Sequence, residues 1–254
     1  MRTSVRGAAV GAAKTVATLA VLIGLWVLVA RVGHFNKVIF PMPSDVASAA
    51  ASHTQELLSA GWTTLQGALG GFLVGNVVGV LLACAIAASV TASRVILPLA
   101  VGVRVVPIVA IAPLLTLVIG RGLATVITVA AMLVFFPTLI NGVLGLRSVD
   151  PAQLELMKIA NASQLQTFVR LRLPVALPRL FAAFQVGAPT AVLGAMLAEW
   201  VASGQGLGYL ILSSGASFDT DVMWAAVILA TAIALLAAAA ATLAGRAVVS
   251  WERD

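Results

Sequence analysis

Long apolar runs separated by shorter polar stretches dominate the chain. A helix that crosses a bilayer needs about 20 mostly apolar residues. Six segments come close to this requirement, at residues 15–33, 65–89, 105–120, 123–146, 177–202 and 222–245. Their connections are polar or charged, at residues 34–64, 90–104, 121–122, 147–176 and 203–221. The third segment is short and contains Pro107 and Pro113, and because proline removes a helical hydrogen bond, we expect a kinked helix there.

Composition agrees with a membrane protein. Of the 254 residues, 61% are hydrophobic and 9% are charged, whereas a soluble domain carries about 25% charged residues. So few polar groups could not cover a soluble fold, and we expect an all-α integral membrane protein with one domain over residues 1–254. The one cysteine, Cys84, excludes an internal disulfide, and His34 and His53 are too few for a Cys/His zinc site.

Basic residues predict the orientation in the membrane, because lysine and arginine concentrate on cytoplasmic loops. With a cytoplasmic N-terminus, twelve of the fifteen basic residues face inward, and only Arg31, Lys37 and Arg121 face outward. This predicts six spans, both termini in the cytoplasm, and outer loops at residues 34–64 and 203–221. A cleaved signal peptide is the alternative for the first segment, although its apolar run is long for one.

Glycines recur at intervals of four within the second segment. Gly67, Gly71, Gly75 and Gly79 therefore lie along one stripe of a helix. Small residues at this spacing let another helix approach closely. The stripe predicts a packing seam, either within the chain or between two chains.

The connection at residues 147–176 contains the start of a first short helix. Asp150 can cap this helix, Pro151 fits its first position, and Gln153 would complete a capping box. Asn161 stands where the helix should end, and asparagine tolerates the left-handed backbone conformation found there.

A second short helix follows in the same connection. Ser163 and Gln166 repeat the capping pattern, and we expect Pro174 to stop the helix. Two helices exceed what a simple connector of about 2–8 residues needs. They suit docking onto a cytoplasmic protein, or alternatively a loop held on anionic lipid by nearby basic residues. These residues are Lys158, Arg170 and Arg172.

In the same connection, Glu155-Leu156-Met157 is followed by Asn161 and then by Leu173-Pro174. This arrangement resembles the cytoplasmic signature of the permease subunits of bacterial ABC importers that use a binding protein. That signature begins with Glu-Ala-Ala, has a glycine a few residues later, and ends near Leu-Pro. Leu-Met replaces Ala-Ala here, and asparagine replaces the glycine.

Three other stretches are similar to the nitrate, sulfonate and taurine branch of this family. Phe40-Pro41-Met42-Pro43-Ser44-Asp45 resembles the start of its outer loop. Gly145-Leu146-Arg147-Ser148-Val149-Asp150-Pro151 resembles its lead into the cytoplasmic loop. Gly206-Leu207-Gly208-Tyr209-Leu210-Ile211, followed by Phe218-Asp219-Thr220, resembles its last outer loop. The resemblance runs from about residue 15 to residue 250.

The resemblance implies a type I ABC importer permease fold with six transmembrane helices and a cytoplasmic coupling-helix pair, in a bacterial inner membrane. The expected partners are a second copy of the chain, two ATPase subunits and an extracytoplasmic solute-binding protein. ATP and Mg would bind the partner ATPase, and we expect no catalytic residue, metal or cofactor in this chain. The resemblance assigns ATPase coupling to Glu155, Leu156, Met157, Lys158, Ala160, Asn161, Ala162, Ser163 and Pro174.

The substrate implied by the branch is a small anion such as a sulfonate, taurine or nitrate. A pyrimidine vitamin precursor, riboflavin or an aromatic acid remain alternatives. A secondary transporter or channel is the rival class, but it would need coupling acids or an internal repeat in the membrane. A membrane-embedded enzyme would need a paired nucleophile and base, or metal ligands, at membrane depth.

Polar residues inside the spans are candidates for a transport pathway or gate, because burying them in lipid is costly. They are Asn76, Arg104, Asn141, Gln185 and Glu199. The amides could instead join helices by hydrogen bonds, and Arg104 could simply flank a span on the cytoplasmic side. Two alternatives also remain for Glu199: it lines an outer gate, or it is solvated beside Trp200 at the membrane surface.

Overall fold

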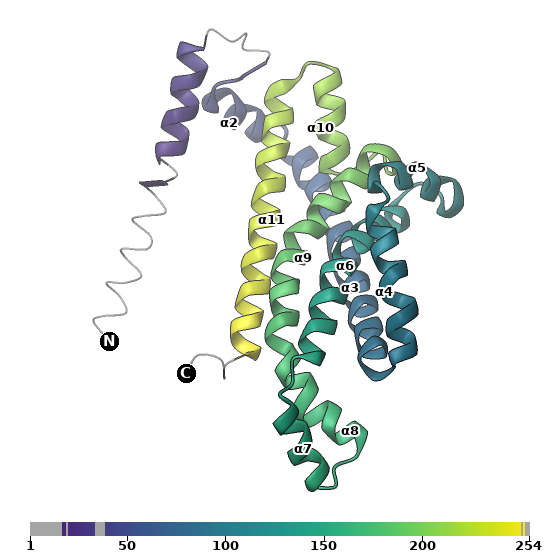
Figure 1. The fold of residues 1–254 in the computed structure, drawn as a ribbon. Helices are drawn as coiled ribbons and strands as arrows, with labels where there is room; N and C mark the ends of the chain where they lie inside the picture. The colour runs from purple at the N-terminus through teal and green to yellow at the C-terminus, as the bar shows by residue number, and fades with distance from the viewer. Residues whose placement is uncertain (1–16, 19, 34–38, 250, 252–254) are drawn as a thin grey trace, which may run out of the picture.

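The computed structural model describes residues 17–18, 20–33, 39–249 and 251. All regular structure in these residues is helical, in agreement with the expected class (Figure 1). Its four long helices are α3 (Thr54–Ala88), α6 (Leu123–Arg147), α9 (Leu173–Ala202) and α11 (Thr220–Val248). Each of them is long and apolar enough to cross a bilayer. His34 and Lys37 lie outside the described residues.

Shorter helices connect or flank these four. They are an apolar helix at Ala20–Val32, α2 (Pro43–Ser52), α4 (Val90–Val105), α5 (Ile108–Ile119), α7 (Pro151–Ile159), α8 (Gln164–Thr167) and α10 (Leu207–Ala216). A π-helical turn, η1 (Phe168–Arg172), joins α8 to α9. In Figure 1, α7 and α8 project from one end of the bundle, and α2 and α10 lie at the other end.

Four of the six expected spans coincide with the long helices. The second one begins earlier than expected, at Thr54 rather than at residue 65. Its added outer turns bury Leu57 and Ala60 in a cluster with α10 and α11, which stabilises helix beyond the apolar run. The other two expected spans are represented by shorter helices, so the count of six crossings stays a prediction.

The third expected span, residues 105–120, contains the short helix α5 rather than one kinked helix over its whole length. The helix α4 ends at Val105, because Pro107 disfavours helical geometry at the residue before it, and the backbone of Pro107 is extended with ψ of 117°. The residues 90–104, which we expected to be a polar joint, form α4 and lie against α3. At 1.5 Å per residue, α4 and α5 measure about 24 and about 18 Å, so each is shorter than the hydrocarbon core of about 30 Å.

The glycine stripe lies against α6, so it forms a seam within the chain. A Cβ atom on Gly67 would stand 2.5 Å from Val126 Cγ1, and one on Gly75 would stand 2.6 Å from the carbonyl oxygen of Ala131. A Cβ atom on Gly71 would collide with Ala130, and one on Gly79 would stand 3.0 Å from Thr138 Cβ. On the opposite face of α3, large apolar side chains are exposed, at Leu69, Leu73, Val77 and Leu81. One face of the helix thus packs on backbone, and the other is left for lipid or another chain.

A second seam brings α9 onto the other side of α6. A Cβ atom on Gly194 would lie 2.8 Å from the Cα atom of Ala130, the residue that Gly71 of α3 also contacts. Ala130 and its neighbours Val129 and Val134 are fully buried. The central helix of the bundle is therefore α6, with α3 and α9 held against it through small residues.

We predict that Gly75→Ala lowers the free energy of unfolding by about 1–3 kcal/mol, because the added methyl group overpacks the seam between α3 and α6. The measurement is the apparent melting temperature of the purified protein in detergent. Gly102→Ala is the matched control, since no heavy atom lies within 4 Å of a Cβ built there. If both variants melt at the same temperature, the close approach at Gly75 is not a constraint.

Candidate functional site

The first helix of the connection between α6 and α9 has a well-defined start. The carboxylate of Asp150 accepts a hydrogen bond from the backbone N–H of Ala152 at 2.9 Å, and Pro151 occupies the first turn. Gln153 makes no reciprocal bond among the described residues, so the capping box predicted for this helix is wrong. The reason is geometric: Asp150 bonds the second residue of the helix rather than the third, and Gln153 is left exposed.

The end of α7 is held by the left-handed residue that the sequence predicts. Asn161 has a φ of +51°, and its N–H donates to the carbonyl of Lys158 at 2.9 Å. The N–H of Ala162 donates to the carbonyl of Met157 at 3.0 Å. These two bonds form a Schellman motif, which reverses the chain sharply after the helix.

The second helix begins with a complete capping box. Ser163 Oγ accepts from the N–H of Gln166 at 3.2 Å, and the Gln166 side chain accepts from the N–H of Ser163 at 2.8 Å. Pro174 does not stop this helix, contrary to the prediction. The π-helical turn η1 precedes it and carries the chain into α9, so Gln164–Ala202 is one helical run. The π-helical turn directly before Pro174 changes the backbone hydrogen-bond pattern at the point where a regular α-helix would need the N–H that proline lacks.

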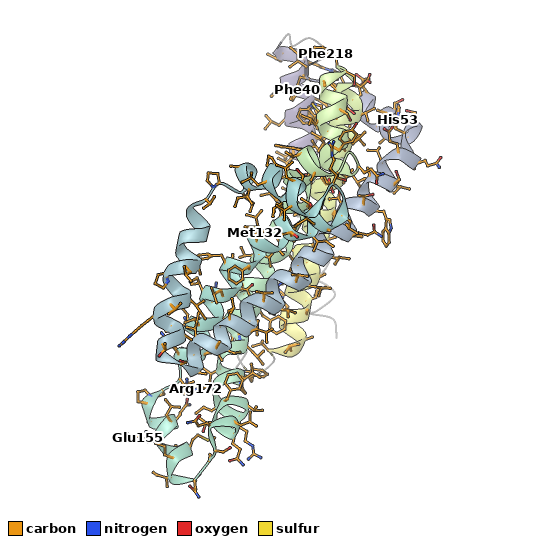
Figure 2. All side chains as sticks on the ribbon, turned by 90° about the vertical axis from the view of Figure 1, so that its right-hand side faces the viewer. Phe40, His53, Met132, Glu155, Arg172 and Phe218 are labelled. Carbon is orange, nitrogen blue, oxygen red and sulfur yellow. The ribbon has the colours of Figure 1, made fainter. Side chains whose placement is uncertain are left out.

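The surface of this helix pair combines charged and apolar side chains. Leu156, Ile159 and Leu165 are 64, 82 and 71% exposed, although they are large and apolar. Of the nine residues expected to couple to an ATPase, Met157, Ala162 and Pro174 are half-buried and the others are exposed. In Figure 2, Glu155 lies at the end of the molecule opposite Phe218. Exposed apolar groups of this size mark a surface that contacts something else.

The polar candidates inside the spans do not converge on one site. Asn76 is buried, donates to the carbonyl of Phe72 at 2.7 Å, and accepts from Thr138 Oγ1 of α6 at 2.6 Å. Asn141 donates to the carbonyl of Pro137 in its own helix at 2.9 Å. Asn76 therefore joins two helices, as the hydrogen-bonding alternative expects, whereas Asn141 bonds to the backbone of its own helix.

Two further candidates, Gln185 and Arg104, lie on other helices. The amide nitrogen of Gln185 lies 3.2 Å from a Cβ built on Gly245, between α9 and α11. Arg104 is in the last turn of α4, and its side chain is outside what the structure describes. An apolar groove of about 360 Å³ lies between α3, α9 and α11, and none of the five polar candidates lines it.

Glu199 is fully buried, so the interpretation that it is solvated at the membrane surface is wrong. Its Oε2 atom accepts from Thr64 Oγ1 at 3.0 Å and from the N–H of Gly208 at 2.8 Å. Thr64 Oγ1 in turn accepts from the N–H of Leu207 at 2.8 Å. The N-terminus of α10 points its free N–H groups and its partial positive charge at the carboxyl group.

Sequence reasoning missed Thr64, because it carries no signal that distinguishes it from other threonines in a helix. It noted the Gly206–Leu207–Gly208 stretch only as a family likeness. The contact joins residues 135 positions apart, and only the packed helices bring them together. Within the described residues, no group of three His, Cys, Asp or Glu side chains could hold a metal ion.

The arrangement of the helices is shared with a solved structure. A chain of the MetNI methionine ABC transporter, solved in inward-facing conformations, has the same fold. The TM-score is 0.69, and the match covers 78% of this chain and 98% of that chain at 20% identity.

Residues 75–253 match the family described as the binding-protein-dependent transport system inner membrane component, and the chain belongs to this family. A probable ABC transporter permease protein of Haemophilus influenzae is 35% identical over 222 residues, which are 87% of this chain and 91% of that protein. The riboflavin transport system permease protein RibX of Chloroflexus aurantiacus is 32% identical over 241 residues, 92% and 88% of the two chains. Relatives at 26–28% identity are named as permeases for formylaminopyrimidine (Halalkalibacterium halodurans), aliphatic sulfonates (Bacillus subtilis and Escherichia coli) and taurine (Escherichia coli).

The protein is therefore a multi-pass inner-membrane permease subunit of an ABC importer rather than an enzyme. Such a permease works with an ATPase and a solute-binding protein. The rival class of secondary transporter or channel does not fit this membership.

We predict that Asn161→Val makes the connection between α6 and α9 about tenfold more sensitive to trypsin at Lys158. The left-handed conformation costs a β-branched residue such as valine roughly 1–2 kcal/mol, whereas asparagine tolerates it, and about 1.4 kcal/mol corresponds to tenfold more local opening. The rate of cleavage after Lys158 in the purified protein measures this. Asn161→Gly is the control and should be cut at the native rate, since glycine adopts positive φ without strain. Equal rates for the valine and glycine variants would contradict a turn held by Asn161.

Proposed function

We propose that this permease forms the pathway for a small solute in an ATP-driven importer, and that its ATPase docks on the α7–α8 helix pair. The observation that carries the docking surface is the exposed apolar face of a pair whose turn is defined by hydrogen bonds. Leu156, Ile159 and Leu165 supply this face. Glu155 and Lys158, both exposed on α7, supply charged groups beside it.

The lipid-bound alternative for this pair has less support. A loop that lies on the bilayer would run across the end of the bundle, whereas α7 and α8 project away from it along its length (Figure 1). The 25 residues of α6 measure about 37 Å, which already exceeds the hydrocarbon core of about 30 Å. Residues beyond its end therefore lie in the aqueous phase, where a protein partner is the better cover for apolar side chains.

The assembly that we propose has two copies of this chain, two ATPase subunits and one binding protein. The exposed apolar stripe on α3 leaves room for lipid or for a second copy. Both termini and the α7–α8 pair would be cytoplasmic, in line with the twelve basic residues on that side. ATP and Mg would bind in the ATPase, whose hydrolysis would bias two conformations of the permease by differential affinity.

The substrate that we propose is a small anion of the sulfonate, taurine or nitrate kind. The motifs shared with that branch and the relatives named for aliphatic sulfonates and taurine support it. Riboflavin and a formylated pyrimidine are the alternatives, because the relatives named for them are 32 and 28% identical. Uptake of labelled taurine, riboflavin and formylaminopyrimidine by cells that express the complete system separates these substrates.

We predict that Glu155→Lys and Leu156→Asp each abolish copurification of the ATPase with the tagged permease in a mild detergent. Each substitution reverses a charge or places one on the docking face. The amount of ATPase per permease, measured by quantitative mass spectrometry, should fall at least about tenfold, the factor for a loss of about 1.4 kcal/mol.

Glu56→Lys is the matched control for this experiment. It makes the same charge reversal on a side chain that is 54% exposed, at the other end of the molecule. It should retain the ATPase. If all three variants retain it, the α7–α8 pair is not the docking surface.

A further inference from the structure

The outer ends of three helices meet at one buried carboxylate. Thr64 belongs to α3, Glu199 to α9, and the two N–H groups that complete the cluster begin α10, at Leu207 and Gly208. The residue before α10 is Gly206, which has no side chain with which to cap its own helix. The helix α10 is thus capped entirely by side chains of α3 and α9.

Gly206 also shows how closely the carboxylate is enclosed. Its φ is +96°, and a Cβ atom built on it would collide with the carboxyl group of Glu199. Gly208 lies in the same way against the backbone carbonyl of Met196 in α9. Only glycine fits at both places, so the start of α10 rests directly on α9 with no side chain between them.

The carboxylate is nevertheless incompletely satisfied. Both of its hydrogen bonds reach Oε2, and Oε1 is buried without a hydrogen-bond partner among the described residues. A buried carboxyl oxygen without a hydrogen-bond partner is costly, and this cost opposes the closed arrangement that the hydrogen bonds from Thr64 and Gly208 hold.

The same helix connects this cluster to the docking surface. The run Gln164–Ala202 has 39 residues and measures about 58 Å, with Glu199 near one end and α8 at the other. Thr64 is on a different helix, α3, so a tilt of α9 relative to α3 changes the distance between Thr64 Oγ1 and Glu199 Oε2. At 3.0 Å this bond is near the upper end of the range for hydroxyl donors, and about 0.5 Å more breaks it.

We propose that Glu199 and Thr64 form a latch that holds α10 on α3 and α9, and that the latch opens when α9 tilts during the ATP cycle. Glu199 is then a positioning residue for transport, which acts through α10 and Thr64 rather than on the substrate. The inference rests on the proposed function for the origin of the tilt.

The test uses a single reporter cysteine in the purified complex of permease and ATPase. Cys84→Ala removes the one native cysteine, and Ser214→Cys places a thiol of similar size on α10, where the side chain is 6% exposed. The rate of reaction with a water-soluble maleimide is measured without nucleotide and with ATP and vanadate. We expect the rate to rise about tenfold with ATP and vanadate, which corresponds to about 1.4 kcal/mol.

Variants of the latch separate it from an ordinary structural cap. Glu199→Gln and Thr64→Val should raise the rate without nucleotide about tenfold and remove the further rise with ATP and vanadate. Thr64→Ser keeps the hydroxyl group and should behave as the native residue does. An ordinary cap predicts instead that the nucleotide-dependent rise keeps its full size in these variants, and this result overturns the latch.

A variant that does not fold and a permease that does not bind its ATPase can both be distinguished from failure of the latch. If Glu199→Gln does not fold, the comparison of Thr64→Val with Thr64→Ser tests the latch. The latch is also overturned if the labelling rate of the reporter protein with native Glu199 and Thr64 does not respond to nucleotide. If the ATPase does not copurify, the proposed function fails, and the rates without nucleotide still test whether the carboxylate and hydroxyl hold α10. If the ATPase binds and hydrolyses ATP while α10 remains protected, the latch alone is wrong.

Discussion

The structure depends on the close approach of two helices to α6. Gly71 of α3 and Gly194 of α9 both contact Ala130, so three backbones meet with almost no side chain between them. In a bilayer the lipid tails are as apolar as the protein, and helix association relies on this dense van der Waals contact rather than on hydrophobic burial alone. A longer side chain at any of these positions would separate the helices along their whole length.

The buried polar contacts are consequences of these seams. Asn76 reaches Thr138 only because Gly75 and Gly79 bring α3 onto α6, and this bond then aligns the two helices. The cluster at Glu199 likewise needs α3 and α9 to be held against a common partner. Asn76 and Glu199 therefore mark where the helices are packed.

The two ends of the molecule differ in how far they were predictable. The capping residues of the α7–α8 pair act on neighbours within about five positions, so the turn at Asn161 and the cap at Ser163 were found from the sequence. The continuation of the helix through Pro174 was not predicted, because the π-helical turn η1 that precedes this proline has no sequence signature. Helix α4 was missed because Arg94 and the polar residues near it resemble a loop, although its packing on α3 makes it helical.

The features that could be predicted from single segments are those governed by local chemistry. Apolar length, glycine spacing, helix caps and the distribution of basic residues act within one helix or one loop, and they specified a helical membrane protein with a projecting helix pair. The tertiary structure alone decided which helix faces the glycine stripe and that Glu199 is buried. It also decided that Thr64 and Glu199, far apart in sequence, together cap α10. These contacts depend on which surfaces the packed helices bring together, and no pattern within a single segment encodes that.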